Sequence, residues 1–279
     1  MEIAESIDDL RTARARLTGS VGLVPTMGAL HEGHLALVRR ARSDNDAVIV
    51  TIFVNPAQFN DPKDLATYPK TLECDLALLR DSGVALVFTP TAEVMYPPGY
   101  QTYVTVEQIT QMLEGAHRPG HFRGVATVVA KLFNLTQPQR AYFGQKDAQQ
   151  VMVIRRMVAD LNFPLEIVVC PTVREPDGLA LSSRNRNLTP EQREAAPVLF
   201  RALLSAQAAY EQGERDPEML RRAMRDTLAA EPLAEVDYVS VADAETLEEL
   251  VEPVNRPALV SLAVRIGQTR LIDNLIVPG

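Results

Sequence analysis

Cysteine is scarce in this 279-residue chain, which contains only Cys74 and Cys170 and no C-x-x-C pair. This scarcity argues against a disulfide framework and a cysteine zinc site, and it fits a reducing compartment. No apolar run approaches the roughly 20 residues that a membrane-spanning helix needs. The first residues also lack the basic and apolar regions of a signal peptide. We therefore expect a cytoplasmic protein with no membrane partner.

Positive charge and aromatic side chains are also in short supply. The net charge is −8, the isoelectric point is about 5.1, and only 5% of the residues are aromatic. This composition argues against a protein that grips a nucleic acid over a long surface. The charge is unevenly distributed along the chain. Residues 1–171 contain 18 acidic and 16 basic side chains, a net charge of −2, whereas residues 172–279 contain 18 acidic and 12 basic side chains, a net charge of −6. The first part therefore leaves room for one small anion.

Short apolar runs alternate with longer amphipathic stretches between Val21 and Pro171. The alternation predicts a parallel sheet with helices on both faces, an α/β fold. The predicted strands are 21–26, 47–54, 84–90, 141–144 and 165–171, and the predicted helices are 33–44, 71–83, 124–138 and 147–161.

The sequence changes character after Pro171, where a polar and turn-rich connection begins. Two long helices are predicted beyond it, from Thr189 to about residue 213 and from Asp216 to about residue 230, each beginning at a good cap followed by proline. Three strands follow, and we expect them to form a small mixed sheet. These strands are 236–241, 258–267 and 269–278. We expect two domains, 1–175 and a smaller α+β domain, 176–279.

The segment VPTMGALHEGH, residues 24–34, lies between the first predicted strand and the first predicted helix. At the carboxyl end of a parallel strand, a helix N-terminus offers free N–H groups and the positive end of its dipole, which suit a phosphate. Gly33 lets a ligand approach the backbone, and His31 and His34 project the same way if the helix starts there. Loop histidines are usually structural, and two of them could bind a metal, but HEGH does not have the HExxH spacing. Nucleotide phosphate binding is the favoured interpretation.

Two further stretches offer groups for a phosphate. GQKD, residues 144–147, follows a predicted strand, and its Lys146 can reach a phosphate as a mobile charge. Asp147 is better interpreted as a helix cap. LSSRN, residues 181–185, places two hydroxyls and a guanidinium in the connection between the domains, although serine and asparagine favour any turn.

Two more stretches are open to a structural and a functional interpretation. FVNPAQF, residues 53–59, presents Asn55 and Gln58 to hydroxyl and carboxylate oxygens, but an Asn-Pro turn explains it about equally well. HRPGHFRG, residues 117–124, is dense in cations before a predicted helix, and it either lines an anion site or only covers one.

These five stretches, taken in order, resemble the pantoate–β-alanine ligase family. PTMGALHEGH, FVNPAQF, RPGHFRGV, GQKDAQQ and LSSRN match that family along most of the first 187 residues, and HEGH also resembles the wider HxGH nucleotidyltransferase superfamily. The resemblance implies a Rossmann-like doubly wound parallel sheet that binds nucleotide and pantoate, with a C-terminal lid domain. It implies ATP-dependent condensation of pantoate with β-alanine through a pantoyl adenylate, with release of AMP and pyrophosphate, by a cytoplasmic homodimer that uses Mg²⁺.

The resemblance also implies roles for individual residues. His34 would be the catalytic proton donor, with His31 and Lys146 on the phosphates, and Val173 would hold adenine by its backbone. Gln58 would contact pantoate and β-alanine, with Gln150 on pantoate and Asn55 close by. No Mg²⁺ ligand is assigned securely, although Asp75 is a candidate. The ATP-binding set would be Met27, Gly28, Ala29, Leu30, His31, Glu32, Gly33, His34, Gly144, Gln145, Lys146, Asp147, Val173, Leu181, Ser182, Ser183 and Arg184.

One position departs from the family, which usually has Glu where this chain has Gln145, a neutral amide in place of an anion. Two other functions stay open at this point. A nucleotidyltransferase acting on a phosphorylated metabolite explains HEGH but leaves FVNPAQF and GQKDAQQ unexplained. A non-catalytic nucleotide sensor would bind ATP without releasing pyrophosphate. Nucleic-acid binding fits least.

Overall fold

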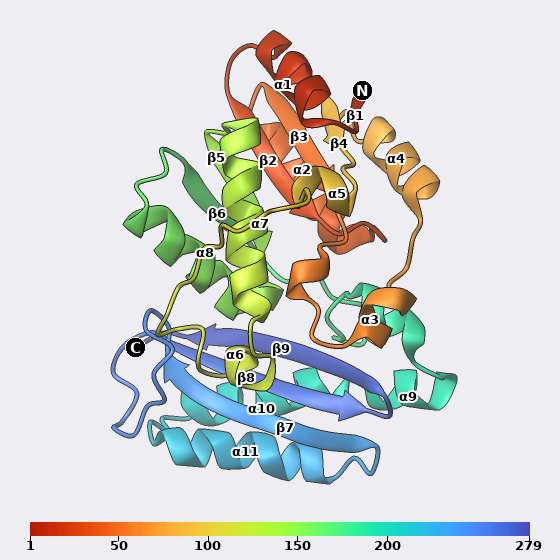
Figure 1. Cartoon of the computed structure of the whole chain (residues 1–279). Helices are drawn as coiled ribbons and strands as arrows, with labels where there is room; N and C mark the ends of the chain where they lie inside the picture. The colour runs from red at the N-terminus through yellow and green to blue at the C-terminus, as the bar shows by residue number, and fades with distance from the viewer. The chain divides into compact units, whose positions relative to one another are not determined.

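The computed structural model describes residues 1–279, which form two compact units (Figure 1). The first unit consists of residues 1–144 and 150–171, and the second of residues 145–149 and 172–279. The second unit therefore includes a short segment from the middle of the first. The domain boundary expected after residue 175 stays a prediction.

A parallel sheet forms the centre of the first unit, as the sequence predicted, and it has six strands rather than the predicted five. Its strand order is β1-β4-β3-β2-β5-β6, so the direction of strand addition reverses between β2 and β5. In open α/β sheets, ligands bind at the carboxyl ends of the strands beside such a reversal. The strands are β1 (Glu2–Ala4), β2 (Val21–Thr26), β3 (Ala47–Ile52), β4 (Leu86–Phe88), β5 (Arg140–Gly144) and β6 (Glu166–Cys170).

Helices cover both faces of this sheet, which confirms the doubly wound fold (Figure 1). Alternate strand residues point to opposite faces, so Leu23 packs in one core cluster and Val24 in the other. The first cluster is built against α1 (Ile7–Arg16), α7 (His121–Thr136) and α8 (Ala148–Asp160), and the second against α2 (Glu32–Asp44) and α4 (Leu72–Asp81).

Several short elements of the first unit were not predicted. Periodicity needs more residues than they contain, and β1 has only three. The short helices are α3 (Pro62–Thr67), α5 (Ala92–Met95), α6 (Glu114–His117) and the 3₁₀ turn η1 (Pro56–Gln58).

The second unit contains three strands, β7 (Ala234–Asp243), β8 (Ala258–Ile266) and β9 (Thr269–Val277), in that order. Both pairs are antiparallel, so the expected mixed sheet was wrong. The tight turn between β8 and β9, with Gly267 at φ +60°, can join only antiparallel neighbours. Helices α10 (Val198–Glu211) and α11 (Pro217–Ala229) share a core with the sheet.

The long helix expected from Thr189 to about residue 213 was also wrong. The chain forms α9 (Pro190–Ala195) and then α10, with Pro197 between them. Proline has no N–H to continue the helical hydrogen bonds, and its ring clashes with the preceding turn. The predicted caps are confirmed, because the side chains of Thr189 and Asp216 accept hydrogen bonds from Gln192 N and Glu218 N.

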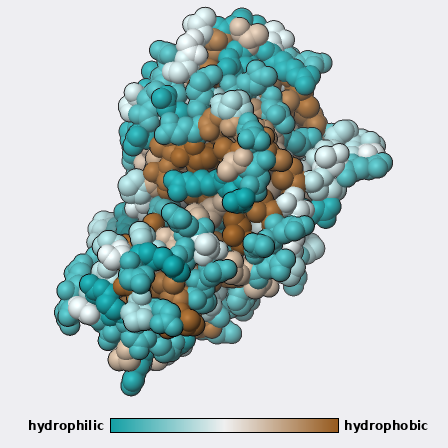
Figure 2. Space-filling model, turned by 90° about the vertical axis from the view of Figure 1, so that its left-hand side faces the viewer, coloured by the Kyte–Doolittle hydropathy of each residue, from teal (hydrophilic) through white to brown (hydrophobic).

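Hydrophilic side chains cover much of the surface in view in Figure 2, and hydrophobic side chains reach that surface in the first unit.

None of the helices combines the length and the apolar character that crossing a membrane requires.

Candidate active site

The loop that leaves β2 turns sharply through two residues in the left-handed region. Gly28 has φ +81° and Ala29 has φ +50°. A Cβ on Gly28 would lie 3.0 Å from Ile52 Cγ2 and 3.1 Å from Asp75 Oδ2. The left-handed backbone conformation therefore favours glycine at position 28, and a Cβ there would be crowded by Ile52 and Asp75.

The carboxylate of Asp75, at the start of α4, holds this loop. Its two oxygens accept hydrogen bonds from Ala29 N and Leu30 N, both at 2.9 Å, and the Thr71 hydroxyl donates to the same group. Asp75 is only 2% exposed. Both oxygens are engaged within the fold, so the structure gives Asp75 the role of a loop clamp, and its role as a candidate Mg²⁺ ligand stays a prediction. No group of three or more His, Cys, Asp or Glu side chains could hold a metal ion.

His31 and His34 lie side by side at the first turn of α2, as the sequence predicted, with ring centroids 4.1 Å apart. His31 is the N-cap, and its Nδ1 accepts a hydrogen bond from Gly33 N at 3.2 Å. The Nδ1 of His34 accepts from His31 N at 3.3 Å. A ring nitrogen that accepts from a backbone N–H carries no proton, so the proton of each neutral ring is on Nε2. The pair therefore has two Nε2–H donors beside a helix N-terminus. Glu32, between them, forms an ion pair with Arg39.

Three predicted substrate or ATP residues of the first unit form one hydrogen-bonded network. The Asn55 amide donates to Gln58 Oε1 at 2.9 Å, and Gln58 Nε2 lies 3.2 Å from the sulfur of Met27. The Tyr96 hydroxyl donates to Asn55 Oδ1 at 2.8 Å, and burial raises the pKa of Tyr96, so this donor stays protonated. Asn55 is 1% exposed. The network fixes the amide of Gln58 beside the loop after β2.

Gly124 explains why this network is possible, and sequence reasoning did not identify it. The Asn55 amide also donates to Gly124 O at 3.1 Å. A Cβ on Gly124 would lie 2.2 Å from Ala57 O, so only glycine lets α7 approach η1 this closely. The sequence signal that could have identified this close contact is a glycine at the start of the predicted helix 124–138.

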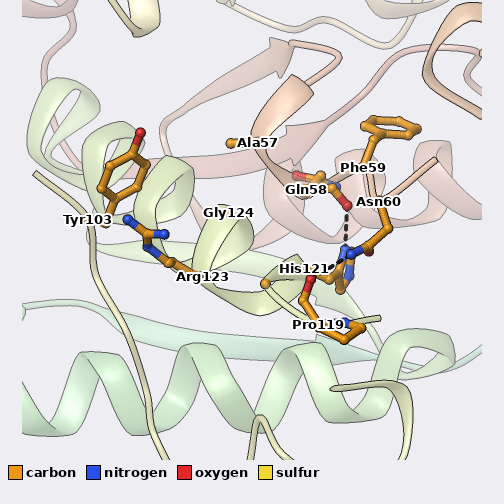
Figure 3. Close-up of a pocket in the computed structure, with 10 residues that line it drawn as sticks. Ala57, Gln58, Phe59, Asn60, Tyr103, Pro119, His121, Arg123 and Gly124 are labelled. Atoms are coloured by element: carbon orange, nitrogen blue, oxygen red, sulfur yellow. Dashed lines mark hydrogen bonds between the residues drawn. The ribbon is translucent and has the colours of Figure 1, made fainter. Parts of the chain in front are cut away.

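A pocket of about 170 Å³ lies beside this contact, between η1 and the start of α7 (Figure 3). His121 Nδ1 donates to Gln58 O at 2.7 Å, and Arg118 Nη2 donates to the same carbonyl at 3.4 Å. Arg123 instead stacks on the Tyr103 ring, with its guanidinium carbon 3.8 Å from the ring centroid. Of the cation-rich stretch, Arg118 and His121 hold the backbone of Gln58, and His121 and Arg123 line the pocket. The lining residues are Ala57, Gln58, Phe59, Asn60, Tyr103, Pro119, Gly120, His121, Arg123 and Gly124.

The remaining predicted residues are divided between the units. Gly144 ends β5, and Gln150 lies in α8, both in the first unit. Gln145, Lys146 and Asp147 form the 3₁₀ turn η2 (Gln145–Asp147), in the second unit. Lys146 Nζ lies 3.6 Å from Asp147 Oδ1, and the lysine side chain is 19% exposed.

The other predicted residues of the second unit lie on a narrow hairpin. Leu181 N donates to Val173 O at 3.0 Å, and Glu175 N donates to Leu179 O at 2.8 Å. Ser182 follows and caps the 3₁₀ turn η3 (Ser183–Asn187), where its hydroxyl accepts from Arg184 N at 3.3 Å. The hairpin therefore brings Val173 and Leu181 together, although eight positions separate them in the sequence.

The doubly wound sheet and the helix start after β2 define a protein of the nucleotide-binding α/β class. The family model for pantoate–β-alanine ligase matches residues 2–276. The chain belongs to the pantoate–β-alanine ligase family and is a ligase.

Relatives and solved structures agree along the whole chain. A pantothenate synthetase of Roseiflexus sp. (strain RS-1) is 64% identical over 276 residues, which cover 99% of each chain. The crystal structure of pantothenate synthetase from Thermus thermophilus superposes with a TM-score of 0.94 at 52% identity, covering 99% of both chains. That of pantoate–β-alanine ligase from Francisella tularensis, complexed with β,γ ATP and β-alanine, has a TM-score of 0.81 at 39% identity and covers 99% of this chain and 97% of its own.

Proposed function

We propose that this protein condenses pantoate with β-alanine to form pantothenate in two steps at the expense of ATP. In the first step a pantoate carboxylate oxygen attacks the α-phosphorus of ATP, which gives pantoyl adenylate and releases pyrophosphate. In the second step the β-alanine amine attacks the acyl carbon and AMP leaves. The pairing of His31 and His34 at the helix start after β2 is the observation that supports this best.

The first step needs charge stabilisation more than a protein nucleophile, because the carboxylate itself attacks. The Nε2–H groups of His31 and His34 can donate to phosphate oxygens as negative charge develops, with no reorganisation of the loop. The free N–H groups of α2 add the positive end of the helix dipole. His34 is the catalytic proton donor in this proposal, and Met27 to Leu30 supply the backbone that passes beneath the nucleotide.

Mg²⁺ enters this proposal as part of the ATP substrate. Mg²⁺ is commonly held by substrate phosphates with few protein carboxylates, which agrees with a chain that offers no cluster of metal-binding side chains. The ion would neutralise phosphate charge.

Asn55, Gln58 and Gln150 are proposed to contact pantoate and β-alanine. Their amides donate and accept hydrogen bonds without charge, which suits substrates that carry both hydroxyl and carboxylate oxygens. The relative from Francisella tularensis was solved with β,γ ATP and β-alanine, which supports the same substrate class.

The residues of the second unit are assigned to ATP from the family resemblance. Lys146 would bind the phosphates, the backbone of Val173 would hold adenine, and Leu181 to Arg184 would close over the phosphates. The resemblance also supports a homodimer in the cytoplasm, and sedimentation velocity of the purified chain tests its oligomeric state.

The decisive experiment uses pantoate labelled with ¹⁸O in its carboxylate. The adenylate route moves one labelled oxygen into AMP, because the attacking oxygen stays on the α-phosphorus when the amine displaces it. Mass spectrometry of the AMP should therefore show one ¹⁸O. Unlabelled AMP would eliminate the acyl adenylate, and ADP as the product would eliminate the proposed reaction class.

The histidine pair is tested by His34→Ala, which we expect to lower kcat by about 10²–10³-fold, as removal of one charge-stabilising donor does elsewhere. His117→Ala is the control, since His117 is exposed and outside the proposed site. Unchanged turnover in His34→Ala would remove this residue from catalysis.

A further inference from the structure

The edge strand β9 of the second unit contacts both segments that are proposed to bind ATP there. It packs against η2, which carries Lys146, and against η3, which follows the hairpin. Two consecutive β9 residues, Asp273 and Asn274, are buried, with exposed fractions of 2% and 5%. Buried polar side chains need hydrogen-bond partners. Asp273 has its partner on the hairpin, and Asn274 has its partners in η2.

Asp273 binds the hairpin through one arginine. Arg174 Nη1 donates to Asp273 Oδ2 at 2.5 Å and Nη2 donates to Oδ1 at 2.9 Å, so the pair is bidentate. Arg174 Nη1 also donates to Gly178 O at 3.1 Å, and the guanidinium lies 3.9 Å from the centroid of the Phe200 ring. Because a bidentate pair fixes orientation as well as distance, Asp273 determines where residue 174 lies relative to β9.

Residue 174 directly follows Val173, whose backbone is the proposed contact for adenine. Val173 O is already hydrogen-bonded to Leu181 N across the hairpin. Any displacement of Arg174 therefore moves both Val173 and Leu181.

Asn274 binds the other segment through its amide. Its Nδ2 donates to Gln145 O at 3.0 Å and to Lys146 O at 2.9 Å. Its Oδ1 accepts from Gln145 Nε2 at 3.0 Å. One side chain thus makes three hydrogen bonds to η2 and fixes the backbone from which Lys146 extends.

We propose that Asp273 and Asn274 are positioning residues for ATP, Asp273 for the adenine hairpin and Asn274 for the Lys146 turn. The proposal rests on the proposed function and adds two residues that touch no substrate. Because they hold different parts of the nucleotide, their loss has different kinetic consequences. A displaced adenine contact weakens binding in the ground and transition states alike, whereas a displaced Lys146 weakens charge stabilisation in the transition state.

The experiment compares steady-state kinetics of Asp273→Asn and Asn274→Ala. We expect Asp273→Asn to raise KM for ATP about tenfold with kcat within about twofold, and Asn274→Ala to lower kcat about tenfold. KM for β-alanine should change less than about twofold in both. Arg174→Lys keeps the charge without the bidentate geometry, so its KM for ATP should lie between those of wild type and Asp273→Asn.

Asp237→Asn is the control, because the Asp237 carboxylate on β7 pairs with Arg270 on β9 at the same 2.5 Å and with Arg265 on β8 at 3.3 Å, and not with the hairpin or η2. It should lower thermal stability as Asp273→Asn does while leaving KM for ATP unchanged. If the two variants give the same kinetic profile, or if Asp273→Asn leaves KM unchanged, the positioning role is wrong. Calorimetric titration measures the affinity of wild type and of both variants for ATP without turnover. If the wild-type chain binds ATP but makes no pantothenate, the proposed reaction is wrong, and the positioning role can still be tested by ATP affinity.

Discussion

The two units each hold a proposed ATP-binding loop with one buried aspartate, but the partners of the two aspartates differ. Asp75 accepts from Ala29 N and Leu30 N, next to a left-handed turn. Asp273 accepts from the guanidinium of Arg174, 99 positions away in the sequence. The first carboxylate therefore shapes the backbone of a loop directly, whereas the second joins two segments through a side chain.

This difference matters because the two arrangements tolerate change differently. Backbone N–H groups cannot move without changing the loop, so the clamp at Asp75 has no substitute partner. A guanidinium on a flexible stem can shift and rebind, so the loss of its partner should displace the hairpin rather than unfold it. We expect the first clamp to govern stability and the second to govern nucleotide affinity.

The largest effect is expected from Asp75→Ala. The change leaves two buried N–H groups without an acceptor and should lower the free energy of unfolding by about 3 kcal/mol. Urea denaturation measures this change. Glu73→Ala, exposed in the same helical turn, is the control and should change stability by less than about 0.5 kcal/mol. Similar results for the two variants would contradict the role of Asp75 as a clamp.

The hairpin is tested by Gly178→Ala against Gly99→Ala. Both glycines have positive φ, +92° and +86°, but a Cβ on Gly178 would lie 2.3 Å from Phe200 Cδ1, whereas nothing lies within 4 Å of one on Gly99. Gly99→Ala should cost only the left-handed backbone conformation, about 1 kcal/mol. Gly178→Ala should cost about 2 kcal/mol and also raise KM for ATP, because Phe200 supports Arg174. Thermal unfolding measures the loss of stability in each variant, and steady-state kinetics measure KM for ATP. Equal losses of stability in the two variants would show that the Phe200 side chain moves aside without cost.

A smaller effect is expected from Gln145→Glu, which restores the usual family residue. The carboxylate has no N–H to donate to Asn274 Oδ1, so the free energy of unfolding should fall by about 1 kcal/mol. Gln268→Glu, exposed in the turn between β8 and β9, controls for the added negative charge. Increased stability in Gln145→Glu would mean that this turn rearranges around a carboxylate.

The smallest effect is expected from the second ion pair of the hairpin, Asp177 with Arg193. The hydrogen bond from Arg193 lowers the pKa of the Asp177 carboxyl in the folded protein. The ionised group therefore stabilises the fold above the unfolded pKa near 3.9, and this contribution is lost as pH falls through the lower folded pKa. Because both side chains are partly exposed, Asp177→Asn should cost less than about 1 kcal/mol at pH 7.

Stability curves of this variant and of wild type should therefore converge only as the pH falls below the lowered pKa of folded Asp177. A difference that persists in acid would show that the Asp177 charge is not its source. ATP kinetics should stay unchanged, in contrast to Asp273→Asn.

The sequence predicted the parts of this fold that depend on local patterns. Five of the six strands of the first unit, the start of α2 at the histidine pair and the caps at Thr189 and Asp216 follow from periodicity and capping residues. Pro197 was a local signal as well, and reading it as a helix breaker would have separated α9 from α10. The orientation of the C-terminal strands was likewise available from the tight turn at Gly267.

The clamps could not be predicted in the same way. The sequence around Asp75 and Asp273 does not indicate the loop or the arginine that they hold, because those partners are 45 to 99 positions away. Gly124 belongs to the same class, since its contact with η1 depends on packing between segments that are distant in sequence. Local patterns specify elements, whereas the fit between elements specifies the site.

The hydrogen bonds between Asn274 and the Lys146 turn have a consequence for synthesis on the ribosome. The chain emerges from its N-terminus, and 128 positions separate Asn274 from Lys146. The first unit can fold as it emerges, but the turn that presents Lys146 lacks its anchor until Asn274 has left the exit tunnel. A chain stalled before that point would therefore carry the histidine pair without a fixed lysine, and full activity should be acquired only after Asn274 has emerged.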